Sequence, residues 1–119
     1  MPDTTEDSES VAALLCLRAA PGRSDELAEL IGRMVEVTNR LHGPIFYGAS
    51  RSGTDDHVFI VYEMWASRGD VTTHLAAPEY QALNIEARDR GLLVPADDEL
   101  ALSALGDGPI RSMQLRPLT

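Results

Sequence analysis

The 119-residue sequence predicts an α+β domain whose strands and helices follow one another as β-α-β-β-α-β. Three observations predict this class. Short apolar runs follow the first ten residues and occupy the middle of the chain, and the middle run, HVFIVYEMWA, is rich in β-branched and aromatic residues, as strands are. One segment repeats apolar residues every three to four positions, as an amphipathic helix does. A second helical segment is interrupted by Pro78, which marks a break between two helical pieces.

The first two elements are predicted from the chain's opening forty residues. The run VAALLCLRA is short and apolar, and Pro21-Gly22 ends it, so we expect a buried strand. Ser24 or Asp25 can cap the helix that follows. Its predicted apolar stripe comprises Leu27, Leu30, Ile31, Met34, Val35, Thr38 and Leu41, and His42-Gly43-Pro44 closes it.

The middle of the chain predicts a hairpin of two strands. IFYGASRS is the first strand, GTDD provides the turn, and HVFIVYEMWA is the second strand. Alternation places Phe59, Val61, Glu63 and Trp65 on one face of this strand, and Val58, Ile60, Tyr62 and Met64 on the other. Both faces are apolar, so both require a cover. We therefore expect a homodimer with opposed sheets, and a change of Val61 to Asp to break the dimer or the fold.

The remainder of the chain predicts the second helical segment and the last strand. Ser67 can cap a helix, Pro78 restarts it, and Gly91 ends it. Residues 92–108 have no decisive pattern, and residues 109–118 form a plausible last strand. The complete order is the ferredoxin-like arrangement, with a four-stranded antiparallel sheet and both helices on one face. We expect one domain over residues 11–119, preceded by a disordered acidic tail at residues 1–10.

Composition restricts the class of function. Nineteen acidic and ten basic side chains give a net charge of -9, which disfavours binding to nucleic acid or to an anionic membrane. No apolar run approaches the ~20 residues of a membrane span, and no signal peptide is evident, so a cytoplasmic location is expected. We expect a small-molecule substrate, no metal and no cofactor, because metal-ligand spacing and nucleotide-binding motifs are both lacking.

Several stretches together resemble the antibiotic biosynthesis monooxygenase (ABM) domain family, within the dimeric α+β barrel superfamily. They are LLCLRAAPGRSDELAEL, HGPIFYGASRS, VFIVYEMWASRGDVTTHLAAPEYQAL and IRSMQLRPL. The resemblance implies a cofactor-free monooxygenase acting on an aromatic or polyketide-like molecule, with an isomerase or cyclase, or a non-catalytic binding dimer, as the alternatives. Its polyketide oxygenases carry Asn and Tyr at the positions of Val61 and Val71, whereas Trp65 matches them. The residues expected of its heme-degrading branch are not present.

One candidate site follows from the residues and the resemblance together. His74 is the candidate catalytic base, because an imidazole titrates near neutrality. Trp65 and Phe59 would form an apolar box around a flat substrate, with Val61 and Val71 as further lining. Tyr47 or Arg51 would donate a hydrogen bond to a developing oxyanion. A packed corner without catalytic function is the alternative for Trp65 and His74. Glu63 is expected to be paired, Tyr80 to anchor a helix to the sheet, and His42 and His57 to be exposed.

Overall fold

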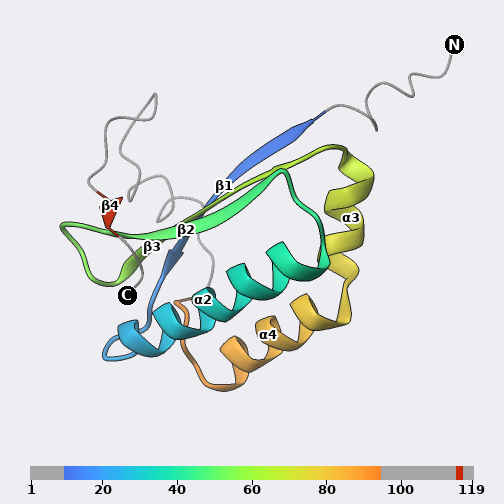
Figure 1. Ribbon diagram of the computed structural model, residues 1–119. Coiled ribbons are helices and arrows are strands. Elements are labelled where there is room, and N and C mark those ends of the chain that lie inside the picture. The colour runs from blue at the N-terminus through green and yellow to red at the C-terminus, as the bar shows by residue number, and fades with distance from the viewer. Residues whose placement is uncertain (1–9, 95–114, 117–119) are drawn as a thin grey trace, which may run out of the picture.

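The computed structural model describes residues 10–94 and 115–116, and Figure 1 shows a single sheet with its helices on one side. Residues 1–9 of the expected acidic tail at 1–10, and residues 95–108 of the segment 92–108, lie outside the described residues. The elements are β1 (Val11–Arg18), α2 (Ser24–Leu41), β2 (Phe46–Ser52), β3 (Val58–Trp65), α3 (Arg68–Ala76), α4 (Pro78–Asp89) and β4 (Leu115–Arg116). The predicted β-α-β-β-α-β order is confirmed, with the second helix divided into α3 and α4.

The sheet is antiparallel, and its strands lie in the order β1-β3-β2-β4. β3 is therefore a central strand, hydrogen-bonded to a neighbouring strand along each edge. The register pairs Tyr47 of β2 with Glu63 of β3, and Val11 of β1 with Trp65. The described part of the last strand pairs with β2, and it is far shorter than the predicted span of 109–118.

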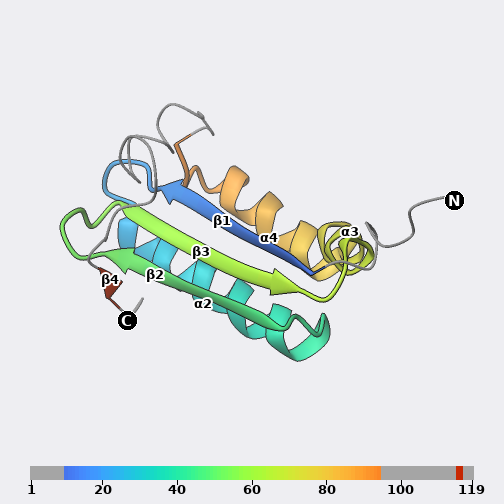
Figure 2. The same ribbon diagram turned by 90° about the horizontal axis from the view of Figure 1, so that it is seen from above.

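The core lies between α2, α4 and the sheet, and Figure 2 shows both helices beneath the strands. Apolar residues at helical spacing in α2 pack against the β3 face that carries Phe59, Val61 and Trp65. Val61 belongs to this face and points toward the helices. The change Val61→Asp would therefore test the packing of the core, and it would not test a dimer contact on the opposite face of the sheet. Leu41 departs from the predicted stripe, because it lies in the last turn of α2 and is exposed.

Local residues explain where α3 and α4 begin, whereas the start of α2 differs from the prediction. Ser67 caps α3 by accepting a hydrogen bond from the Asp70 backbone N–H at 3.1 Å. Pro78 occupies the first turn of α4, where the absent N–H costs nothing. The expected cap of α2 is wrong, because Arg23 occupies that position and Ser24 donates its hydroxyl to the Asp56 carbonyl.

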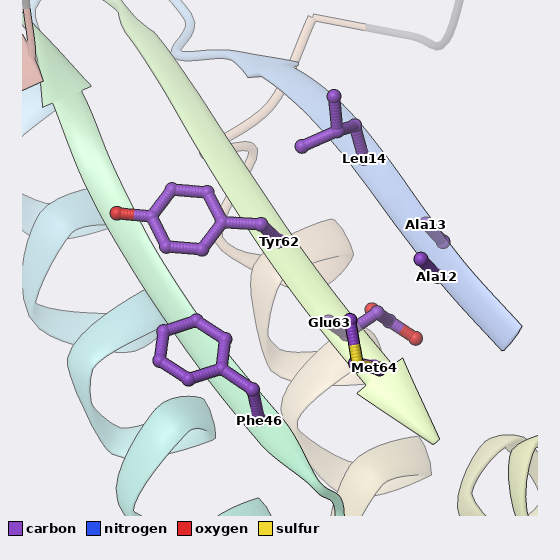
Figure 3. Close-up of a pocket in the computed structure, with 7 residues that line it drawn as sticks. All are labelled: Ala12, Ala13, Leu14, Phe46, Tyr62, Glu63 and Met64. Atoms are coloured by element: carbon purple, nitrogen blue, oxygen red, sulfur yellow. The ribbon is translucent and has the colours of Figure 1, made fainter. Parts of the chain in front are cut away.

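The helix-free face of the sheet carries an open apolar hollow of about 420 Å³ (Figure 3). Phe46 stacks on Tyr62 there, with ring centroids 5.6 Å apart. Gly48 makes room for this stack, since a Cβ at that position would lie 3.0 Å from the Phe46 ring. The hollow is lined by Ala12, Ala13, Leu14, Phe46, Tyr62, Glu63 and Met64. The apolar character of this face is thus retained in the fold, with Leu14 44%, Phe46 51% and Met64 40% exposed.

Candidate functional site

His74 lies at the centre of an aromatic cluster between the sheet and the helices. Its ring centroid is 4.7 Å from Trp65 at the end of β3, 5.5 Å from Tyr47 of β2 and 4.3 Å from Tyr80 of α4. His74 is 1% exposed and Trp65 is fully buried. Four elements, β2 and the consecutive β3, α3 and α4, therefore contribute to one cluster, at the end of the sheet that α3 adjoins in Figure 1.

His42 is the partner that sequence reasoning missed. Its Nδ1 lies 2.9 Å from the Nδ1 of His74, and the two rings meet edge to face at 5.0 Å. The expectation that His42 is exposed is wrong, because the last turn of α2 lies against β2, where Asn39 donates to the Tyr47 carbonyl at 3.0 Å. The C-cap position of His42 is the only local signal that could have indicated it.

The environment of His74 favours its neutral form. Burial, followed by the proximity of His42, lowers the pKa of His74 to about 4, against its usual 6.5. Its Nδ1 is occupied by His42, which leaves Nε2 as the ring nitrogen of His74 outside this contact. The Nε2 of His42 is buried and has no hydrogen-bond partner in the described part of the chain. A neutral imidazole such as that of His74, with one nitrogen outside the contact, is the arrangement that a general base requires.

Glu63 introduces a carboxylate into the same compartment. It is buried, and its Oε1 accepts a hydrogen bond from the Trp65 indole N–H at 2.9 Å. The prediction that Glu63 is paired is thus confirmed, with an indole as the partner. This bond fixes the plane of the Trp65 ring that faces His74.

Tyr47 is a buried, protonated phenol. Burial, and then the charge of Glu63, raise its pKa well above the usual value, and a hydrogen bond with the Thr38 side chain opposes this change. The hydroxyl therefore stays neutral at physiological pH. A neutral phenol can donate a hydrogen bond to an oxyanion, as the predicted role of Tyr47 requires.

The other predicted site residues lie at different distances from His74. Val71 packs against the core one turn before His74 on α3, and Phe59 and Val61 are buried under α2. Arg51 does not join the cluster. It lies opposite Phe59, four residues along β2 from Tyr47, which is roughly 13 Å of strand.

Arg51 has partners of its own at that far end of the sheet. Its guanidinium lies 4.9 Å from the Phe59 ring centroid and bonds to Asp25 at 3.0 Å. The Asp25 side chain is 98% exposed, so this ion pair at the start of α2 contributes little to stability. One substrate atom cannot contact both His74 and Arg51 in this arrangement.

Two further properties concern only residues 10–94 and 115–116. No group of three or more His, Cys, Asp or Glu side chains within these ranges is placed to hold a metal ion. None of the helices described there combines the length and the hydropathy that crossing a bilayer demands.

The chain belongs to the antibiotic biosynthesis monooxygenase family, whose family model matches residues 10–84. The match extends from the first strand into α4 and thus includes every residue of the aromatic cluster. A comparison with curated proteins finds no match.

Solved structures support the same fold. A protein from Bacteroides thetaiotaomicron, provisionally assigned as an antibiotic biosynthesis monooxygenase, superposes with a TM-score of 0.65 at 19% identity, over 71% of this chain and 80% of that one. One from Nitrosomonas europaea with the same provisional assignment gives 0.67 at 16%, over 75% and 84%. One from Deinococcus radiodurans gives 0.62 at 20%, over 70% and 81%. At these identities the likeness establishes the fold alone.

Proposed function

We propose that this protein is a cofactor-independent monooxygenase that oxidises an electron-rich aromatic or polyketide-like molecule. The observation that carries the proposal is the His74 imidazole, neutral and buried among the rings of Trp65, Tyr47 and Tyr80, with Nε2 outside the contact with His42. These rings contact one another, so a flat substrate would stack against them only after α3 has opened. Membership of the monooxygenase family supports this reading.

The proposed chemistry needs no added reductant. Nε2 of His74 removes a proton from an acidic CH₂, or from a phenol conjugated with that CH₂. The resulting anion transfers electrons from this carbon to dioxygen and forms a C–O bond. The hydroperoxide then loses water as its O–O bond breaks, so that CH₂ becomes C=O and the second oxygen atom leaves in water. Tyr47, held protonated, donates a hydrogen bond to the developing enolate oxygen.

We propose that the substrate reaches the aromatic cluster at α3. Of the nine residues of α3 only His74 is buried, and the helix is bounded by extended residues at Ser67 and Ala77. An element that buries one side chain opens at low cost. We place the substrate's entry beneath α3, between it and the end of β3.

We also place the protein in a homodimer. The helix-free face exposes Leu14, Phe46 and Met64 around the hollow of Figure 3. A contiguous apolar surface of this kind is unfavourable in water. Two sheets facing one another would cover it, and the helix-side compartment of each copy would stay intact.

Oxygen uptake tests the proposal. Purified protein is mixed with 1,8-dihydroxyanthrone, and separately with 1,4-dihydroxynaphthalene, in an oxygen electrode without added metal or flavin. We expect uptake far above autoxidation and, with the anthrone, one carbonyl formed per O₂ consumed. His74→Leu should lower the rate roughly a hundredfold, whereas His57→Asn, in an outer turn, should not. Equal rates for the wild type and His74→Leu would exclude His74 as the base.

Proton transfer without oxygen is the second candidate, and the His42–His74 pair favours it equally, since such a pair can move protons between substrate positions. An isomerase or cyclase would convert a carbonyl substrate at the same rate under nitrogen. Binding of the aromatic probes without turnover would instead support a non-catalytic ligand-binding dimer.

A further inference from the structure

The contact between the two histidines is unusual in the atoms that it joins. Both nitrogens are Nδ1, 2.9 Å apart, so one ring must donate a proton and the other must accept it. Two imidazolium rings cannot share this contact, because neither would offer a lone pair. The pair can therefore gain only one proton while the contact is kept.

The two rings lie in unequal surroundings. His74 is enclosed by aromatic rings, where a charge loses its hydration. His42 is only partly buried and caps the C-terminus of an 18-residue helix, where the helix dipole favours a cation. The positive charge of Arg40, in the last turn of α2, opposes a further positive charge on His42. The other titratable groups around His74 are Tyr47 from β2, Glu63 from β3 and Tyr80 from α4, and the carboxylate among them favours a cation in the pair.

We propose that His42 and His74 form one proton-carrying unit, in which a proton taken up at Nε2 of His74 displaces the Nδ1 proton of His74 onto Nδ1 of His42. One N–H bond forms at each end of the unit and one breaks between the rings. The charge rests on His42 at the end of α2, and His74 stays neutral throughout. Within the proposed oxygenase, on which the catalytic part of this inference rests, His42 is the residue that holds the substrate's proton.

This assignment explains how a weak base can act near neutrality. The low pKa of His74, about 4, means that an isolated imidazole at this position would hold a proton poorly at pH 7. Transfer to His42 lowers that penalty, because the charge moves from the aromatic cluster to the C-terminal end of α2. The His42 ring is partly exposed there, although its Nε2 is buried without a partner among the described residues.

The test begins with a measurement that needs no substrate. The ¹⁵N chemical shifts of both rings are followed by NMR between pH 8.5 and 4.5 in ¹⁵N-labelled wild type. We expect His42 to become the imidazolium while His74 stays neutral and changes from the Nδ1–H to the Nε2–H tautomer at the same midpoint. Protonation of His74 before His42, or titration of His42 with no change at His74, would overturn the proposal.

Two variants of His42 distinguish the effect of its hydrogen bond to His74 from the effect of its ability to carry a proton. His42→Asn places an amide near the position of Nδ1 and keeps a hydrogen bond without titrating, whereas His42→Phe keeps the ring volume alone. His57→Asn is the matched control at a remote histidine. In both His42 variants we expect the tautomer change of His74 to disappear from the pH range, and it should persist in the control. Its persistence in both His42 variants would contradict the proposal, and the wild-type titration decides the matter should either variant fail to fold.

Kinetics then separate this inference from the proposed function. If the wild type oxidises the anthrone probe, His42→Asn should lower kcat roughly tenfold and shift the acidic limb of the kcat profile to lower pH. An unchanged kcat and pH profile would refute the relay and leave the oxygenase intact. Absence of turnover in the wild type would refute the oxygenase, and the NMR titration would still decide whether the two rings share the proton.

Discussion

Glu63 and Trp65 are joined by a buried hydrogen bond within a single strand, from the indole N–H to the carboxylate at 2.9 Å. The two side chains lie on the same face of β3, two residues apart. The bond holds the indole against His74 and gives the indole N–H its only partner among the described residues.

Removal of the Glu63 acceptor should therefore destabilise the fold. Glu63→Ala leaves the buried indole N–H unpaired, and we expect a loss of about 1–3 kcal/mol in the free energy of unfolding. Glu63→Gln keeps an acceptor oxygen and should cost less than about 1 kcal/mol. Urea unfolding of the three proteins measures the difference. Equal losses in both variants would mean that the charge, and not the hydrogen bond, matters.

Stability should fall in mild acid because of His74. Its folded pKa of about 4 lies below the ordinary 6.5, so the unfolded chain binds this proton more readily. The contribution is complete above pH 6.5, is lost as the pH falls toward 4, and amounts to at most about 3 kcal/mol. Below pH 4 this residue causes no further loss.

The matched comparison is unfolding at pH 7.5 and pH 4.5. His74→Leu should lack most of the acid-induced decrease, whereas His57→Asn should keep it. The carboxyl of Glu86, whose pKa the Arg33 hydrogen bond and then the Arg90 hydrogen bond lower to about 2, titrates mainly below this window. An identical pH dependence in the wild type and His74→Leu would contradict the assignment.

The helix-free face should hold two copies together. Met64→Asp places a charge on that face and should convert a dimer into a folded monomer. Ile85→Asp is the control, because Ile85 is similarly exposed, at 51% against 40%, but lies on α4. Sedimentation velocity gives the mass of each protein. A monomeric wild type, or a dimer that tolerates Met64→Asp, would count against opposed sheets.

The amides of α3 should exchange with solvent faster than those of α2. α3 buries one side chain, whereas α2 buries Leu27, Ala28, Leu30, Ile31, Met34 and Thr38. Local opening therefore exposes much less apolar surface in α3. Hydrogen exchange measured by mass spectrometry checks this. Equal protection of the two helices would refute the entry route beneath α3.

The periodic features of this protein could be predicted from the order of its residues. The period of α2 and the alternation in β3 reflect which side chains leave water, so the buried faces that carry Leu27, Phe59 and Trp65 could be predicted from residue spacing. Pro78 and Ser67 act within one helical turn, and their effects were predictable for that reason. His74 and Trp65 were recognised as neighbours because one short turn separates their elements.

The groups that reach His74 and Trp65 from distant elements follow from the arrangement of whole helices and strands in space. His42 reaches His74 across 32 residues, because the length of α2 and the Asn39 bond to β2 bring the helix end to this side of the sheet. The same strand register that brings Tyr47 to Glu63 keeps Arg51 at the far end with Asp25. Such contacts depend on how whole elements are placed, and a local pattern of residue types carries no record of that placement.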